Sequence, residues 1–161
     1  MANERRLFKV DDARIMYRNF RGEARQYNNA GDRNFNLVLT EEQANEFLEA
    51  GFRVRVKPPR DGFEEPLRTM TVKVGYKYRP PRVVVIDGNK KRELDEDTID
   101  EVDYMDIEKI DMTIRPYYWS RPNGDSGVTA YLNSMFITLV EDPYAEKYDH
   151  IGEQPAEDNP F

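Results

Sequence analysis

The run Arg33-Asn34-Phe35-Asn36-Leu37-Val38-Leu39 passes without a break into Thr40-Glu41-Glu42-Gln43. In the first part, Phe35, Leu37 and Leu39 alternate with polar or exposed positions, which is typical of a half-buried β-strand. The second part is a capping box, in which a threonine and a glutamine three residues later close the first turn of a helix. A strand that leads directly into a short helix is therefore predicted at the centre of the first half of the chain.

The predicted helix continues through Ala44, Phe47 and Leu48, which line one helical face, and it ends at Gly51. Outward from it, period-two patterns predict strands, and the acidic segment Leu94–Ile110 predicts one or two short helices. Six or seven strands with so few helices favour a mainly β fold, a small antiparallel barrel rather than a doubly wound sheet. The predicted strands are Leu7–Phe20, Arg33–Leu39, Phe52–Lys57, Leu67–Tyr76, Arg82–Ile86, Asp111–Trp119 and Val128–Val140.

The composition excludes several kinds of site. The 161 residues include no cysteine and one histidine, His150, so disulfides, thiolate metal sites, a cysteine nucleophile and a Ser-His-Asp triad are excluded. The N-terminus lacks an apolar signal core, and no run of about 18 apolar residues occurs. We therefore expect a soluble, cytoplasmic protein that does not contact a membrane, with one domain over residues 1–140 and a tail over residues 141–161.

Charge is distributed unevenly along the chain. Residues 1–92 hold 20 Lys and Arg against 13 Asp and Glu, whereas residues 93–161 hold 4 against 18. The formal net charge of −7 therefore conceals a basic first half and an acidic second half. Such asymmetry indicates nucleic-acid binding combined with an acidic arm, because the local field and not the net charge decides what a surface attracts.

Basic residues alternate with aromatic residues in three regions of the chain. Single-stranded nucleic acid requires this mixture, because cationic side chains follow the phosphates while flat rings stack on unpaired bases. The alternative is that the aromatics pack the barrel and the arginines are ordinary surface residues, as we expect for Phe35 in the core. The candidate nucleic-acid-binding residues are Tyr17, Arg18, Phe20, Arg21, Arg25, Tyr27, Arg33, Arg53, Arg55, Lys57, Lys73, Tyr76, Lys77, Tyr78, Arg79, Arg115, Tyr117, Tyr118, Trp119 and Arg121.

Catalytic signatures are missing from the sequence. The carboxylates between Asp95 and Asp111 lack the spacing of an EF-hand, and the interleaved Ile99, Val102 and Ile107 favour an amphipathic helix with a solvated polar face. The chain has neither a phosphate-binding glycine loop nor a Gly-x-Ser-x-Gly elbow. We therefore expect no catalytic residue, no metal and no cofactor, and a metal-dependent nuclease is the least supported function.

Several short motifs occur in a characteristic order over residues 13–142. The chain resembles a family of tailed-phage proteins described as single-stranded DNA-binding proteins with an OB-like barrel. The resemblance implies an OB-fold, single-stranded DNA as the ligand and a role in phage DNA replication or recombination. The motifs are Arg18-Asn19-Phe20-x-Gly22, Tyr27-Asn28, Gly31-Asp32-Arg33-Asn34-Phe35, Arg79-Pro80-Pro81-Arg82-Val83-Val84, Leu94-Asp95-Glu96 and Ile114-Arg115-Pro116-Tyr117.

The acidic tail, residues 141–161, has seven acidic residues against one lysine and holds three prolines. Its few apolar residues cannot offset the entropy of ordering it, so we expect it to be disordered. It ends in the C-terminal tip Glu157-Asp158-Asn159-Pro160-Phe161, which resembles the acidic tip of bacterial single-stranded DNA-binding proteins, although Asn159 replaces an apolar residue. A basic-rimmed apolar pocket of a partner protein could take the Phe161 ring and the terminal carboxylate.

The leading hypothesis is a non-catalytic single-stranded DNA-binding protein whose C-terminal tip recruits replication or repair proteins. The alternative is a module that mimics DNA and binds a host enzyme through its acidic half. A pure mimic has no need of the Arg- and Tyr-rich first half, so that half favours the first hypothesis. The sequence leaves the oligomeric state open, a homodimer included.

Overall fold

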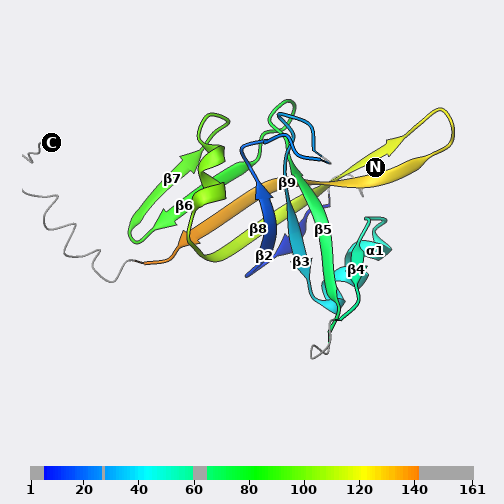
Figure 1. The fold of residues 1–161 in the computed structure, drawn as a ribbon, viewed down its shortest axis with the longest axis horizontal. Coiled ribbons are helices and arrows are strands. Elements are labelled where there is room, and N and C mark those ends of the chain that lie inside the picture. The colour runs from blue at the N-terminus through cyan, green and yellow to red at the C-terminus, as the bar shows by residue number, and fades with distance from the viewer. Residues whose placement is uncertain (1–5, 27, 60–64, 142–161) are drawn as a thin grey trace, which may run out of the picture.

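The computed structural model describes residues 6–26, 28–59 and 65–141 (Figure 1). Its nine strands form one sheet, and it has one α-helix and one described 3-10 helix. No helix in these ranges is long and apolar enough to cross a membrane. The elements are β1 (Phe8–Val10), β2 (Arg14–Asn19), β3 (Arg33–Leu39), α1 (Glu41–Glu49), β4 (Arg55–Lys57), β5 (Leu67–Val74), β6 (Arg82–Asp87), β7 (Lys90–Leu94), η2 (Ile99–Tyr104), β8 (Ile107–Ser120) and β9 (Ser126–Leu139).

β9 connects all parts of the sheet. The main path runs β1-β8-β9-β5-β3-β2, with β4 paired to β5, while β6 and β7 branch from β9. The pairs of β9 with β5 and with β6 are parallel, and the other strand pairs are antiparallel. Without β9 the described sheet would fall into three separate pieces.

The predicted strand Leu7–Phe20 is divided in two where the chain changes partner. β1 pairs with β8, whereas β2 pairs with β3 at the other end of the path. Between them Asp12 has a φ of 53°, and its backbone N–H donates to Asp111 Oδ1 at 2.8 Å. The Ala13 N–H then donates to the Ile110 carbonyl at 2.7 Å. Consecutive strands therefore form both ends of the path, and the sheet curls into a barrel.

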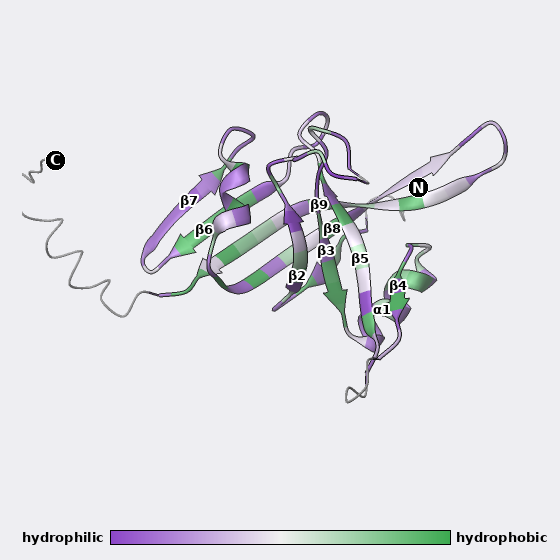
Figure 2. Cartoon of the chain, in the orientation of Figure 1, coloured by the Kyte–Doolittle hydropathy of each residue, from purple (hydrophilic) through white to green (hydrophobic). Residues whose placement is uncertain are grey.

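The barrel interior is filled by the apolar members of the alternating patterns, and Figure 2 shows hydrophobic and hydrophilic residues following one another along the strands. Phe20 stacks on Phe35, with 5.2 Å between ring centroids. The predicted capping box of α1 is present, and Ala44 and Phe47 are buried against the sheet. Leu48 was expected on the same helical face, but its side chain is 50% exposed, because it points away from the core.

The acidic segment differs most from its prediction. Leu94 ends β7, a strand that the sequence patterns did not indicate, and the only helical turn described in the segment is η2. From Ile107 onward the chain already belongs to β8. β4 is also shorter than the strand predicted for Phe52–Lys57. Its Val56 is exposed, although the alternating pattern places it on the apolar face of that strand.

Candidate nucleic-acid interface

The face of the sheet that is turned away from the core is polar, basic and aromatic where β5, β9 and β8 meet. Lys73 pairs with Tyr131, Tyr131 is opposite Arg115, and Trp119 is opposite Gly127. Residues that pair directly across two strands share one face of the sheet. We name this surface the outer face. Its members are Thr71, Lys73, Arg115, Tyr117, Trp119, Gly127, Thr129 and Tyr131.

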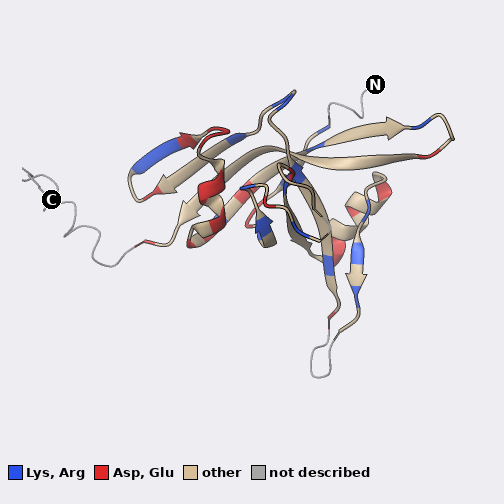
Figure 3. Cartoon of the chain, turned by 45° about the horizontal axis from the view of Figure 1, so that its top comes forward, with Lys and Arg blue, Asp and Glu red and all other residues tan. Residues whose placement is uncertain are grey.

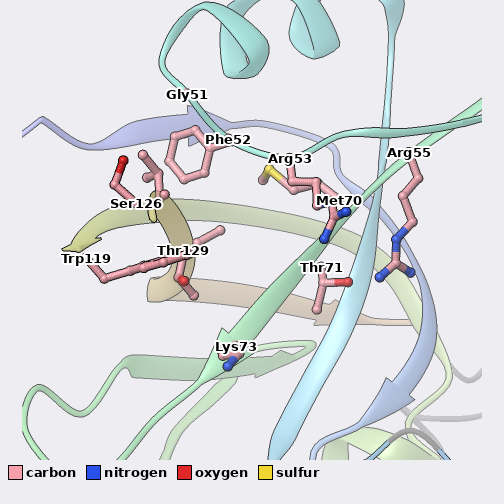
Figure 4. A pocket seen from close by; sticks show the side chains of 13 residues that line it. Gly51, Phe52, Arg53, Arg55, Met70, Thr71, Lys73, Trp119, Ser126 and Thr129 are labelled. Carbon is pink, nitrogen blue, oxygen red and sulfur yellow. The ribbon is translucent and has the colours of Figure 1, made fainter. Parts of the chain in front are cut away.

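A hollow of about 480 Å³ opens beside the outer face, between the segment after α1 and the β8–β9 hairpin (Figure 4). Arg53 and Arg55 extend into it from the β4 region, and Lys73 and Trp119 border it from β5 and β8. The Phe52 ring is part of the same wall, and Phe52 forms a parallel bridge with Val128. Four predicted site residues from three separate segments therefore line one hollow.

The cations of this region have no acidic partner among the residues that the structure describes. Arg53, Arg55 and Lys73 form no ion pair with a carboxylate in the described ranges, and the same is true of Arg115 and Arg121. Isolated cations that face one another in a hollow raise the local positive potential. The hollow is therefore suited to an anion.

Arg115 is the most enclosed of these cations. Burial lowers the pKa of its guanidinium, and the nearby Arg79 guanidinium lowers that pKa further. Its Cζ atom lies 4.9 Å from the centroid of the Tyr131 ring. An anion bound between Arg79 and Arg115 would remove the repulsion between two like charges.

The outer face continues onto a two-stranded arm. The ends of β8 and β9 project beyond the other strands, so the hairpin tip has no third strand beside it (Figure 1). Trp119 lies on this arm, with the Arg121 guanidinium 5.0 Å from its ring centroid. Tyr117 is half exposed and contacts the Tyr131 ring edge-to-face at 6.1 Å between centroids.

Three predicted cations have structural partners instead. Arg18 donates to the carbonyls of Val102 and Met105 at 3.0 and 2.8 Å. Arg21 binds the Tyr104 hydroxyl and the Glu23 carboxylate, and its hydrogen bond to Glu23 raises the pKa of Arg21 and lowers the pKa of Glu23. Arg25 pairs with the same Glu23 at 3.5 Å.

Phe20 corrects the sequence-based assignment. Its side chain is 0% exposed and stacked on Phe35, so it cannot reach a nucleic acid in this structure. Two other assignments, Tyr27 and the C-terminal tip Glu157–Phe161, lie outside the described residues.

The remaining predicted residues lie around the rim of the sheet. Arg33 covers Tyr76 at 5.5 Å and approaches Glu96 at 3.9 Å. Burial raises the pKa of Tyr76 to about 12, and its hydroxyl has no hydrogen-bond partner in the described structure. The exposed loop residue Lys77 contacts the Tyr78 ring at 5.7 Å. Tyr118 is partly buried.

A second, wider groove adjoins the outer face at β2, β3 and β4. Met16 pairs with Asn36, which pairs with Thr71, so this part of the sheet continues the outer face. The groove is lined by Tyr17 and Lys57 among others, but also by carboxylates near the start of α1. Tyr17 is 65% exposed and has a φ of 52° at a bulge in β2.

Three residues of this region were not anticipated from the sequence. Tyr131 was recognised as part of a strand but not as a surface ring, and Phe52 was read only as an apolar member of an alternating strand. No sequence pattern marked Gly127 as part of this surface, because it is next to Trp119 only in the folded hairpin, where the two residues lie opposite each other. Figure 3 shows acidic residues gathered around η2 and on α1, while the tip of the arm carries both a basic and an acidic segment. No group of three or more His, Asp or Glu side chains in the described ranges could hold a metal ion.

Comparison with known proteins gives both a family and a fold. Residues 2–159 match the family model described as "Putative phage ssDNA-binding domain". No curated protein is similar enough in sequence to match the chain. The single-stranded DNA-binding protein from bacteriophage Enc34 has a similar structure, with a TM-score of 0.50 and 16% identity over 94% of this chain and 88% of that chain. Its complex with single-stranded DNA gives a TM-score of 0.51 and 15% identity over 86% and 89%.

These likenesses show a shared fold, and the predicted mainly β, OB-like barrel is confirmed. The identity to both structures is low, so the positions of the binding residues rest on the geometry of this chain.

Proposed function

The chain belongs to the family of phage single-stranded DNA-binding domains, and we propose that this non-catalytic protein holds single-stranded DNA on its outer face and in the adjoining hollow. One observation carries the proposal: Arg53, Arg55 and Lys73 converge on a hollow bordered by Trp119, with no described carboxylate paired to them. Cations that hold phosphates beside a ring that stacks on a base are the two elements of sequence-tolerant binding to single strands.

The biological role follows from this binding. The protein would coat single strands exposed during phage DNA replication or recombination, in the cytoplasm of the infected host. Duplex DNA buries its bases in the stack, so it offers phosphates but no base for Trp119 or Tyr117. We therefore expect a strong preference for single strands.

The test is a titration with labelled poly-dT, with a duplex of equal length as competitor, at two salt concentrations. Arg53→Ala/Arg55→Ala should weaken binding and reduce the log–log salt slope, because each lost phosphate contact contributes about 0.7 to it. The matched control is Lys90→Ala/Lys91→Ala, which removes two exposed cations from β7, at the far end of the sheet from β4 (Figure 1). Equal affinity of the wild type for duplex, or equal loss in both variants, would refute the proposal.

We further propose that the C-terminal tip Glu157–Phe161 is a docking peptide for replication or repair proteins. The tip lies outside the described residues, so its support is the Pro-Phe end with two carboxylates before it. Phe161→Ala should abolish capture of the partner in pull-downs from infected cells, because the partner's apolar pocket loses its ring. Recovery of the same proteins with and without Phe161 would contradict it. Light scattering of the same samples gives the oligomeric state.

A further inference from the structure

Gly127 lies in a strand where its backbone does not require glycine. Of the seven described glycines, five have a positive φ, and the two exceptions are Gly127 and Gly75. A glycine inside a strand is unfavourable by roughly 0.5–1 kcal/mol relative to alanine, since it loses more backbone freedom on folding. Gly127 lies inside β9 and therefore needs another explanation, and Gly75, which directly follows β5, has no positive φ to account for it either.

The explanation at Gly127 is the indole of Trp119. A Cβ atom added to Gly127 would lie 2.5 Å from Cζ2, 2.9 Å from Cε2 and 3.2 Å from Nε1 of Trp119. Real Cβ atoms essentially never approach ring carbons so closely. The indole thus occupies the space that any other residue at position 127 would fill.

Gly75 has the same relation to Tyr131. An added Cβ would lie 3.3 Å from Cε1 and 3.6 Å from Cδ1 of that ring. The contact is less severe than at Gly127, so a small shift of the ring would relieve it. Both rings also have an arginine against them, Arg121 at 5.0 Å from Trp119 and Arg115 at 4.9 Å from Tyr131.

We propose that Trp119 and Tyr131 are two base-stacking subsites of the same construction, in which a bare glycine backbone holds the ring and an arginine lies against it. Each subsite takes one unpaired nucleobase, and Gly127 and Gly75 are positioning residues. The proposal rests on the proposed single-stranded DNA binding and adds where individual bases are held.

The strand register sets the distance between the subsites. Trp119 is opposite Gly127 and Arg115 is opposite Tyr131, which separates the two positions by four residues, or about 13 Å at roughly 3.3 Å per residue. Successive bases stacked as in a duplex lie about 3.4 Å apart. The two subsites therefore hold bases that are not neighbours in a continuous stack.

A purely structural role for these glycines makes a different prediction. Aromatic rings that cover a glycine can stabilise a sheet without contacting any ligand. In that case Gly127→Ala would change the melting temperature and leave the affinity for DNA unchanged. Binding and stability must therefore be measured on the same variants.

The experiment uses the full chain and an oligo-dT probe at fixed salt. Trp119→Ala should weaken binding by roughly 5- to 150-fold, as loss of one base stack predicts. Gly127→Ala should weaken it to a similar extent with an unchanged salt slope, because no phosphate contact is lost. The double variant should bind like Trp119→Ala alone. Gly75→Ala should act in the same direction with a smaller effect, and only while Tyr131 is present.

Gly124→Ala is the matched control. Gly124 is on the hairpin turn with a φ of 96°, and an added Cβ meets nothing within 4 Å. The variant should lower the melting temperature and keep the affinity. If Gly127→Ala alone does not fold, Gly127→Ala/Trp119→Phe, which lacks the indole atoms nearest to position 127, should restore folding and part of the binding.

Three results would overturn the proposal. They are wild-type affinity in Gly127→Ala, an undiminished effect of Gly127→Ala when Trp119 is already alanine, and equal loss of affinity in Gly124→Ala. A wild-type protein that fails to bind oligo-dT would refute the proposed function itself, which keeps the two failures distinguishable.

Discussion

Tyr17 has a backbone conformation that a tyrosine rarely adopts. Its φ of 52° places it in the left-handed region, at the point where β2 bulges, and its ring is directed into solvent beside the wider groove. Such a conformation costs on the order of 1–3 kcal/mol, and strained residues of this kind cluster at binding sites. The bulge thus directs an aromatic ring outward from an edge strand.

The variant Tyr17→Asn separates the effect of the strained backbone on stability from the effect of the exposed ring on DNA binding. Because asparagine tolerates the left-handed region, we expect the free energy of unfolding to rise by about 1 kcal/mol. Affinity for oligo-dT should fall by roughly 1–3 kcal/mol if the ring stacks on a base. Urea unfolding and the oligo-dT titration measure the two effects. Loss of stability together with unchanged affinity would show that the ring serves only the fold.

Tyr76 should make the protein sensitive to alkali. Its pKa is raised to about 12 by burial, whereas a tyrosine in the unfolded chain titrates near 10. The unfolded state therefore loses its proton first, and the stability that the neutral hydroxyl maintains below pH 10 is lost as the pH rises through 12. Tyr76→Phe should be nearly neutral at pH 7, since the hydroxyl has no hydrogen-bond partner among the described residues, and should flatten the decline in stability between pH 10 and 12. Identical declines in both proteins would contradict this assignment.

The buried position of Phe20 could not be predicted from the residues around it. Phe20 was assigned to the DNA-binding residues because basic and aromatic residues are interleaved around it; an unbroken β2 would place positions 14, 16, 18 and 20 on one face. The bulge adds one residue to β2 between Met16 and Asn19, so the alternation is reversed and Phe20 enters the core. No local sequence pattern predicts the extra residue of this bulge.

At the scale of elements, η2 is attached to the barrel through a buried carboxylate. Asp103 is 7% exposed and accepts the backbone N–H groups of Phe20 at 2.7 Å and Arg21 at 3.1 Å. The expectation of a solvated acidic face is therefore wrong at this position. The carboxylate connects the acidic segment to the loop after β2.

Asp103→Ala should destabilise the protein by roughly 2–4 kcal/mol, because two backbone donors lose their charged acceptor. Asp100→Ala is the matched control, since Asp100 is an exposed member of the same turn and should change stability by less than about 0.5 kcal/mol. The midpoint of urea unfolding measures both. Equal midpoints would support the solvated-helix interpretation.

Elements with local signals were predicted well, and those that depend on distant pairing were not. The bounds of β3 and the capping box of α1 follow from neighbouring residues, so both predictions are confirmed. Ile107 was assigned to a helix because it is interleaved with carboxylates as Ile99 and Val102 are, and Ile110 ended the same predicted helical segment. Their pairing with Leu139 and Ile137 of β9 draws them into β8 instead, and no local pattern contains that information.

At the scale of the whole molecule, opposite charges are distributed so that the outer face keeps its positive potential. Carboxylates such as Glu23 and Asp103 pair with basic residues of the first half, whereas Arg53, Arg55 and Lys73 have no described acidic partner. The sequence predicted the basic excess correctly from counts. It could not tell which cations have internal partners, because the Val102 and Met105 carbonyls that bind Arg18 and the Asp103 carboxylate beside Arg21 are distant in sequence.

Deleting Glu157–Phe161 tests this distribution. The melting temperature should not change, because no described core residue is removed. Affinity for oligo-dT at low salt should be equal or slightly higher, since two fewer carboxylates compete for the basic hollow, and the difference should vanish at high salt. A loss of affinity on deletion would mean that the C-terminal tip supports DNA binding instead of opposing it.

The position of β9 as the strand that joins three parts of the sheet has a consequence for biosynthesis. A ribosome that adds about 5–20 residues per second needs on the order of 10 s to reach Ser126. Until then β5, β6 and β8 lack their central neighbour and present unpaired edges, which are templates for aggregation. The nascent chain cannot complete the barrel before β9 has been synthesised, because β9 joins the three parts of the sheet. We therefore expect the sheet to be completed only after β9 has been made, and expect its unpaired edges to need most protection from aggregation during those seconds.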